Sequence, residues 1–579
     1  ARKLIDQHPT AMVTFIIDDL TVSDTQGSLV QVAQYIDTEG PAYGLTKHPT
    51  KGKIYSPHAA TDEDYLPPQP ILDLNYTQAT HGFDRLLGAP LGEDLYEEDK
   101  AYERTVEAMR HTTELKQLQN TQVEFMLLKY CFSTRTTHLT RMHKPTTHQK
   151  AIEAHASAIR TALEKMVTNP GNSTALDDTR WRLAKLPVDK GGLGLQDLTI
   201  IADAQYMAAL GQVRRAAERA VEGGYQPAAK VLEWFSDNNE LEVQLDSLAE
   251  TVNADLDTPI CPNTVDEIAS MPKAKKLTDP IYEKSHQDII TDPNVDKEDK
   301  AYIISGAQDG AGDWIQAVPS LKIFRTASHT YKTGLQKRLC INPAFADEIT
   351  KCGLCDAPAD LNMRRGRHWD TCCVSGGRNH SHNKLRDIIK PMYIEIGKTV
   401  QTEVGGLYAT IDPEGNRRPA DLLESTNSGH NHALDVTIRD PTAKTYITQN
   451  SHRHPLVAAR KGHDQKMADY NKAVQQAGAQ GLPFTLTPLA FETTGAMGEE
   501  TQKWFKKMVS RNAEISGEDF GETTSRMQKG EPCTWTANSF SSFWKQRLSF
   551  YMMVDRATKT SVHIGKSLPR TYRDWTTGG

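Results

Sequence analysis

The sequence predicts a multidomain α+β protein, and three observations lead to that expectation. A chain of 579 residues is long enough for roughly three to five domains. Runs of β-branched residues bounded by turn residues, such as ALDVTI at 433–438, indicate strands. Segment 96–165 has apolar residues at helical spacing with charged residues between them, which indicates amphipathic helices. Apolar runs of eighteen or so residues do not occur, so we expect no membrane-spanning segment.

The charge of the chain is unevenly distributed, although its formal net value is only −7. Residues 237–300 contain sixteen Asp and Glu against six Lys and Arg, and several prolines interrupt them. This composition predicts a solvated linker or a mobile helical insert. Residues 361–400 instead contain eight Lys and Arg against three Asp and Glu. A local basic excess of this kind is typical of nucleic-acid binding.

Two carboxylates stand out beside that basic segment. Asp421 in RRPADLLE and Asp435 in ALDVTIRD flank the polar segment STNSGHNH, which predicts a hairpin connection between two strands. Neighbouring strands bring both acids to one site, where they can hold the divalent metal that phosphodiester hydrolysis requires. The helical segment that follows offers Lys461, Lys466 and Tyr470, and the last two share a helix face. A lone Asp-Val-Thr strand is, however, more often purely structural.

A second cluster has the spacing of metal ligands. The pattern Cys352-x2-Cys355-x12-His368-x3-Cys372 can close a tetrahedron around Zn²⁺, and Cys373 is the other possible fourth ligand. Four N and S ligands predict a structural rather than a catalytic zinc, and free thiols are the alternative. The other cysteines, Cys131, Cys261, Cys340 and Cys533, are scattered. Metal binding in a reducing compartment explains this overall pattern of one cluster and four isolated cysteines better than disulfides do. The neighbouring arginines of RRGRHW could contact phosphates or form a solvated basic face.

Two further patterns lie upstream. MVTFIIDDLTVSD predicts a hairpin with Asp18 and Asp19 at its tip, and on the sequence alone an ordinary acidic turn is the more usual explanation of the pair. The glycines of DKGGLGLQ at 189–196 lack the lysine and hydroxyl spacing of a P-loop. We therefore expect them to serve packing and turn geometry.

The order of these motifs resembles the C-terminal part of non-LTR (LINE-type) retrotransposon polyproteins. These proteins carry a reverse transcriptase, a zinc knuckle and a restriction-like (PD-(D/E)xK) endonuclease whose lysine lies on a later helix. IIDD resembles the metal-binding acid pair of the reverse transcriptase palm, and GLTKHPTKGKIYSP resembles the next palm motif. HGFDRLLGAPLG is similar to the turn that leads into the thumb, and PLAFETTG is similar to a strand and turn of the endonuclease.

The resemblance implies six domains. They are a reverse transcriptase palm remnant at 1–95, a thumb at 96–165, a helical linker region with an acidic insert at 166–345, a zinc knuckle at 346–375, a restriction-like endonuclease at 376–515 and a C-terminal helical tail at 516–579.

The sequence departs from the family pattern at several positions. Thr437 stands where the lysine of the nuclease motif is usual, and Ala420 separates the proline from Asp421, for which we expect a β-bulge to compensate. Ser381 replaces an expected arginine in the segment that resembles RHN-LRD, which weakens any phosphate-binding role there. Glu403 is expected on a helix as an auxiliary acid.

Other polar residues near the predicted nuclease have less specific signals. Glu492 and Thr493 are expected to support the site, although burial of their strand explains them as well. His380 and His382 could transfer protons, but helix capping and surface positions are the more ordinary expectation.

By resemblance, the chain nicks target duplex DNA and supports target-primed reverse transcription of element RNA in the nucleus, after synthesis in the cytoplasm. Asp421 and Asp435 would bind Mg²⁺, Lys466 would stabilise the phosphate or orient water, and Tyr470 would assist. Zinc would be structural.

Asp18 and Asp19 would form half of a polymerase site that also uses Mg²⁺. The family's further carboxylate lies upstream of this acid pair, and the first residues lack both an initiator Met and a signal-peptide pattern. We therefore expect the downstream part of a longer protein and no DNA synthesis from this chain alone. The alternatives are a truncated or decayed, non-catalytic zinc-dependent nucleic-acid-binding protein, and a structural scaffold.

Overall fold

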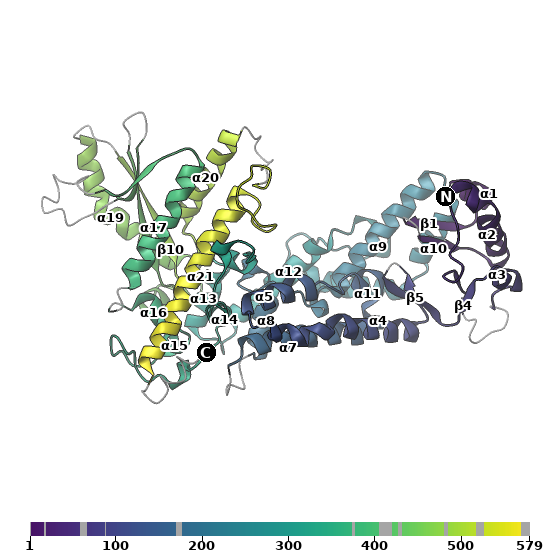
Figure 1. Cartoon of the computed structure of the whole chain (residues 1–579), viewed down its shortest axis with the longest axis horizontal. Helices are drawn as coiled ribbons and strands as arrows, with labels where there is room; N and C mark the ends of the chain where they lie inside the picture. The colour runs from purple at the N-terminus through teal and green to yellow at the C-terminus, as the bar shows by residue number, and fades with distance from the viewer. Residues whose placement is uncertain are drawn as a thin grey trace. The chain divides into compact units, whose positions relative to one another are not determined.

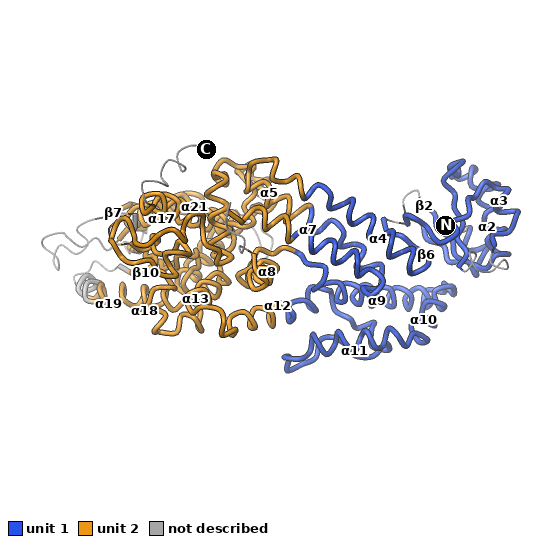
Figure 2. The backbone as a smooth tube through the Cα atoms, turned by 90° about the horizontal axis from the view of Figure 1, so that it is seen from below, with its two compact units in different colours: residues 1–112, 132–159, 196–281 blue, residues 113–131, 160–195, 282–579 orange. Residues whose placement is uncertain are grey.

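The computed structural model describes residues 2–16, 19–57, 66–86, 88–169, 176–372, 374, 377–404, 420–425, 431–479, 484–516 and 526–568 (Figure 1). They form a mixed α+β fold, which confirms the α+β part of the prediction. Among these residues, no helix combines the length and the apolar character needed to cross a membrane. The chain divides into two compact units, the first with residues 1–112, 132–159 and 196–281 and the second with residues 113–131, 160–195 and 282–579 (Figure 2).

The first unit contains three small two-stranded sheets and a set of helices. Its elements, together with two helices that run across a unit boundary, are α1 (Arg2–Gln7), β1 (Met12–Ile16), β2 (Asp19–Ser23), α2 (Gln26–Glu39), β3 (Lys53–Tyr55), α3 (Gln69–Asp73), β4 (Thr77–Ala79), β5 (Gly82–Leu86), β6 (Ala89–Gly92), α4 (Asp94–Met109), α6 (Leu139–Met142), α7 (Gln149–Val167), α9 (Leu198–Glu222), α10 (Ala229–Ser236), α11 (Asn239–Asn253) and α12 (Ala274–Thr291).

The expected N-terminal hairpin is present. Strands β1 and β2 pair antiparallel from Met12 opposite Ser23 to Ile16 opposite Asp19. Apolar residues of this hairpin, including Val13 and Val22, pack with Val32 of α2. Val13 and Val22 lie directly opposite each other in the antiparallel pair, so their side chains share one face. Asp18 lies outside the described residues, and Asp19 is described only as part of β2.

The acidic segment folds into packed helices in the part that lies in the first unit. Of the two alternatives expected for it, the solvated linker is wrong there, and the helical character of the insert is confirmed. Leu241, Leu245, Leu248 and Val252 of α11 follow one another at helical spacing and are all buried. They pack in one cluster with residues of α9 and α10. The acidic side chains occupy the opposite, solvent-facing side, so a high local charge coexists with a packed core.

The second unit combines a four-stranded sheet with helices. Its elements are α5 (Thr121–Leu127), α8 (Asp178–Lys185), α13 (Lys297–Gly306), α14 (Ser328–Arg338), α15 (Leu361–Arg364), α16 (His368–Thr371), α17 (Gly377–Glu395), β7 (Val400–Val404), β8 (Ala420–Ser425), β9 (Asn431–Arg439), α18 (Lys444–Ile447), α19 (Val457–Ala479), β10 (Phe484–Glu492), α20 (Glu499–Ser516) and α21 (Phe540–Ser567).

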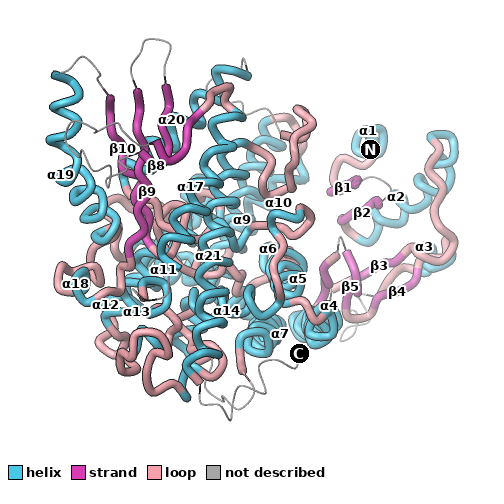
Figure 3. The backbone as a smooth tube through the Cα atoms, turned by 60° about the vertical axis from the view of Figure 1, so that its left-hand side comes forward, coloured by secondary structure: helices cyan, strands magenta, loops and turns pink. Residues whose placement is uncertain are grey.

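The sheet of the second unit has the strand order β10-β9-β8-β7. Strands β7, β8 and β9 run antiparallel, whereas β10 pairs parallel with β9 after a crossover that contains α18 and α19. Helix α19 lies on one side of the sheet, and α17 and α20 lie on the other (Figure 3). The parallel pair needs such a crossover, and this brings the residues of α19 over the β8–β9 hairpin.

Candidate functional site

The β8–β9 hairpin brings Asp421 and Asp435 together, as the sequence predicted. The two strands pair in register from Ser425 opposite Asn431 to Leu422 opposite Leu434. Continued by one residue, that register sets Asp421 opposite Asp435. The main-chain N–H of Val436 donates to Asp421 Oδ2 at 2.7 Å, which holds the first acid against the strand that carries the second.

Helix α19 adds a cation to the two acids. Lys466 Nζ lies 2.8 Å from Asp435 Oδ2, and the same ammonium lies 5.7 Å from the centre of the Tyr470 ring. Met467, Tyr470 and Val474 pack on apolar residues of the hairpin, and this contact fixes the face of α19 that meets the sheet. Lys461 is exposed and lies on another part of the helix surface.

Burial separates the proton affinities of the two acids. Asp435 is only 2% exposed, and burial raises its pKa, an effect that nearby Lys466 opposes and the charge of Asp421 reinforces. Burial also acts to raise the pKa of Asp421, but the His382 ring and the Val436 N–H hold it below its ordinary value. The carboxylate of Asp435 in turn raises the pKa of Lys466 despite burial. Asp421 therefore remains ionised more readily than Asp435, which takes up a proton at a higher pH.

His382 on α17 completes this cluster. Its Nε2 lies 2.9 Å from Asp421 Oδ2, and one ligand atom each from His382, Asp421 and Asp435 lie within 4.8 Å of one another. Octahedral Mg²⁺ places neighbouring ligands about 3 Å apart and opposite ligands about 4 Å apart, so small shifts suffice to surround an ion. The histidine is thus part of the site, and the expectation of a cap or a surface position did not anticipate this.

Glu492, at the end of β10, supports the helix that carries Lys466. Its side chain is fully buried, and its Oε1 accepts the main-chain N–H groups of Ala458 and Ala459 at 3.1 and 3.2 Å. These amides belong to the first turn of α19, where N–H groups lack partners within the helix. A carboxylate there also interacts favourably with the helix dipole. Burial raises the pKa of Glu492.

Two expectations about the neighbouring strand were wrong. Glu403 lies on strand β7 rather than on a helix, with φ at +51°, and its carboxylate pairs with Arg386. The pairs on both sides of this residue, Thr402 with Leu422 and Val404 with Ala420, keep one register. Over these paired residues the expected bulge is therefore absent, and the strained backbone at Glu403 is the local irregularity.

The four predicted zinc ligands also meet. The ligand atoms of Cys352, Cys355, His368 and Cys372 lie within 4.8 Å of one another, and Cys355 Sγ is 3.3 Å from His368 Nε2. A tetrahedral zinc site separates its ligands by about 3.5–3.8 Å, so this Cys₃His group could bind zinc. Cys373, the other candidate, lies outside the described residues.

The local backbone explains why these residues converge. Cys352 and Cys355 lie in a tight turn in which the Cys352 N–H donates to Ala357 O at 2.8 Å. His368 opens the one-turn helix α16, and Cys372 follows its last residue. Burial acts to raise the pKa of Cys352, but the main-chain N–H groups of Cys355 and Leu354 lower it on balance, which favours the thiolate that binds metal.

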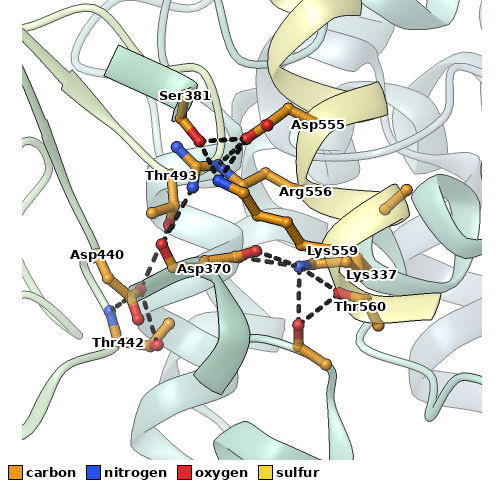
Figure 4. A network of polar contacts seen from close by, with 12 residues as sticks. Lys337, Asp370, Ser381, Asp440, Thr442, Thr493, Asp555, Arg556, Lys559 and Thr560 are labelled. Carbon is orange, nitrogen blue, oxygen red and sulfur yellow. Dashed lines mark hydrogen bonds and ion pairs between the residues drawn. The ribbon is translucent and has the colours of Figure 1, made fainter. Parts of the chain in front are cut away.

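A buried polar network fixes α16, the helix that begins at His368, to the rest of the second unit (Figure 4). Lys337 Nζ donates to both carboxylate oxygens of Asp370, at 3.0 and 2.8 Å, and also to Thr560 Oγ1 at 3.3 Å. Arg556 donates to the main-chain oxygen of Asp370 at 3.1 Å. Since Asp370 lies between His368 and Cys372, α14 and α21 together orient this Cys₃His group.

The same network anchors α17 next to His382. Ser381 is 1% exposed, and its hydroxyl donates to Asp555 Oδ2 of α21 at 2.7 Å, while Lys559 pairs with Asp555 at 2.9 Å (Figure 4). The position where the family resemblance suggests arginine therefore faces α21 within the core. Its role in this chain is to hold α17 in place.

Comparison with known proteins adds no family assignment. Neither the protein-family models nor the curated proteins compared with this sequence give a match.

Proposed function

We propose that the second unit is a metal-dependent endonuclease that nicks duplex DNA. The observation that carries the proposal is the convergence of Asp421, Asp435 and Lys466 beside the end of the β8–β9 pairing, with Lys466 2.8 Å from Asp435. Two hard oxygen ligands and a cation are the groups that phosphodiester hydrolysis needs at one place.

Each residue of the site has a distinct role in this proposal. A bound Mg²⁺ would neutralise the scissile phosphate and lower the pKa of the attacking water. Asp421 and Asp435 hold the ion, and the Val436 N–H keeps Asp421 oriented. Lys466 donates to a phosphate oxygen or orients the water, and the Tyr470 ring restricts the position of its ammonium. Burial of the acids strengthens these interactions.

We further propose that the chain acts in target-primed reverse transcription, in which the nick supplies a 3′ hydroxyl for copying element RNA. What supports this wider role is the order of the sequence motifs: an IIDD hairpin, a zinc group and then the acid pair. The polymerase part rests on Asp18 and Asp19, and Asp18 lies outside the described residues. The proposed place of action is the nucleus.

The test of the nuclease is conversion of supercoiled plasmid DNA to the open-circle form by the zinc-loaded full chain. Mg²⁺ is omitted or added, because a chelator would also remove zinc. We expect nicking when Mg²⁺ is added and none when it is omitted. Asp421→Ala should lose the activity. Asp469→Ala, which changes an exposed residue of α19, should nick like the parent.

DNA binding measured in parallel separates the alternatives. Binding that persists in the parent chain without nicking at Mg²⁺ or Mn²⁺ would contradict the nuclease and favour a zinc-dependent nucleic-acid-binding protein. The absence of any salt-dependent DNA or RNA binding would favour a scaffold.

A further inference from the structure

We propose that His382 is a third protein ligand of the metal held by Asp421 and Asp435, so that the site prefers a first-row transition-metal ion such as Mn²⁺ over Mg²⁺ and Ca²⁺. The inference rests on the proposed nuclease and specifies the class of its metal ion.

The first support is the position of the ring nitrogen. His382 Nε2 lies 2.9 Å from Asp421 Oδ2, and it belongs to the set of three ligand atoms that lie within 4.8 Å of one another. Adjacent ligands of a six-coordinate ion of this size stand about 3 Å apart. His382 and Asp421 already have the separation of neighbouring ligands on one ion.

The second support is the orientation of the ring. His382 Nδ1 lies 3.2 Å from Asn383 Oδ1, and a carboxamide oxygen accepts hydrogen bonds but does not donate them. Nδ1 therefore carries a hydrogen. Nε2 faces the carboxylates, and because Asp421 Oδ2 also only accepts, Nε2 carries a hydrogen too, which a metal ion bound at Nε2 would replace. Metal-binding histidines commonly donate their other N–H to such a partner, which fixes the tautomer that can bind the ion.

The third support is the rigidity of the helix that carries the ring. Ser381, which precedes His382 in the chain, is hydrogen-bonded to Asp555 of α21. Leu385, which follows it, is fully buried. Arg386 pairs with Glu403 of strand β7. These contacts hold α17 in one position. A histidine that binds a metal together with two carboxylates needs such a fixed position.

The chemical consequence follows from the type of donor. Imidazole nitrogen favours first-row transition metals, whereas Mg²⁺ and Ca²⁺ prefer oxygen ligands. One nitrogen and two carboxylates leave the remaining positions of a six-coordinate ion for water and a phosphate oxygen. The acid pair alone would discriminate less between Mn²⁺ and Mg²⁺ than the same pair with His382.

The chain offers a matched control. His380 lies two residues before His382 on α17 and is exposed. His380→Gln and His382→Gln remove the same imidazole from neighbouring positions of one helix. A general effect on helix stability or net charge would appear in both variants, but loss of a metal ligand would appear only in His382→Gln.

The experiment is Mn²⁺ titration of the full chain, loaded with one zinc, followed by electron paramagnetic resonance. Electron spin-echo envelope modulation then shows whether a ¹⁴N nucleus is bonded to Mn²⁺. We expect a ¹⁴N coupling in the parent and in His380→Gln and its loss in His382→Gln, with Mn²⁺ affinity at least about tenfold weaker and Mg²⁺ affinity changed less. Unchanged zinc content and circular dichroism establish that the variants are folded.

The outcomes separate the two proposals. Mn²⁺ binding without a ¹⁴N coupling in the parent, or with one that persists in His382→Gln, overturns the role of His382. The nuclease proposal stands in that case if Asp435→Ala abolishes Mn²⁺ binding. Mn²⁺ binding that is the same in the parent and in Asp435→Ala instead contradicts the metal site on which both proposals depend.

Discussion

Lys466 Nζ lies 2.8 Å from Asp435 Oδ2, an ion pair that joins the crossover helix α19 to strand β9. Asp435 is almost fully buried, and an unpaired carboxylate there would be costly. Lys466 supplies an opposing charge, and in the proposed nuclease the same ammonium would donate to a phosphate oxygen. The pair thus connects the stability of the folded site with the chemistry proposed for it.

The first prediction concerns the role of Lys466 in catalysis as distinct from metal binding. Lys466→Ala should lower the nicking rate by about 10²–10³-fold, because a positioned cation that stabilises developing charge contributes on that scale. Affinity for Mn²⁺ should be retained, since the ammonium repels the metal ion and is not one of its ligands. Single-turnover nicking and Mn²⁺ titration measure the two quantities.

Lys461→Ala is the control for that substitution, because Lys461 is an exposed lysine of the same helix. Its nicking rate should equal that of the parent chain. Equal losses in the two lysine variants would show that the general basic charge of α19 matters and that Lys466 has no special position.

The second prediction concerns the N-terminus of α19. Glu492→Gln removes a charge that accepts two N–H groups of the first helical turn, so the helix should lose about 1–2 kcal/mol of stability. Amide hydrogen exchange in 458–470 should become faster, and nicking should slow as Lys466 becomes less well positioned. Glu500→Gln, which changes a partly exposed glutamate of α20, should leave both unchanged. Unaltered exchange in Glu492→Gln would refute the capping role.

The third prediction concerns zinc. Elemental analysis should find one zinc per chain in the parent and close to none in Cys355→Ser, because three remaining ligands cannot close the tetrahedron. Cys533→Ser, outside the ligand group, should retain the metal. Loss of zinc should also expose residues 346–372 to proteolysis, since Met363 and Trp369 pack beside the ligands. A full zinc content in Cys355→Ser would rule out this ligand set.

The fourth prediction concerns pH and the first unit. Burial lowers the pKa of His148 to about 4, and its ring stacks on that of His143 at 4.0 Å. Below its ordinary pKa of about 6.5, the unfolded chain binds a proton that the folded chain does not. The contribution of the neutral His148 to stability is therefore fully present above pH 6.5. Roughly 3 kcal/mol of it is lost as the pH falls from 6.5 to 4.

Urea unfolding of the parent chain between pH 4 and 7 measures that slope, with a probe specific to the first unit. His148→Gln should flatten it, whereas His111→Gln, which changes an exposed histidine, should leave it unchanged. An identical slope in the parent and in His148→Gln would show that other groups are responsible.

Much of the candidate site could be predicted because its signals are local. The β-branched residues around Asp435 and the polar connection before them specify a hairpin, and a hairpin necessarily brings Asp421 close. The four-residue spacing of Lys466 and Tyr470 specifies one face of a helix. The spacing of the zinc ligands likewise reflects a tight turn followed by a short helix.

What the sequence did not predict depends on contacts between distant segments. His382 enters the site only because α17 is fixed against α21, and a lone histidine before a helical pattern carries no sign of that contact. Glu403 was expected on a helix by analogy with an auxiliary acid of related nucleases. Its strained strand conformation has no simple sequence signal that would have corrected this. The packing of α11, in contrast, had a visible signal in Leu241, Leu245 and Leu248, which the high acidic content obscured.

The most direct measurement is the single-turnover nicking rate of Asp435→Asn beside that of the parent, at saturating Mg²⁺ and with equal zinc content. Asp435→Asn retains the size of the side chain and removes the charge that holds the ion and pairs with Lys466. We predict a fall of at least about 10³-fold, with DNA binding retained and with 3′-hydroxyl ends at the parent's nicks. Nicking by Asp435→Asn at the rate of the parent would contradict the proposed metal site.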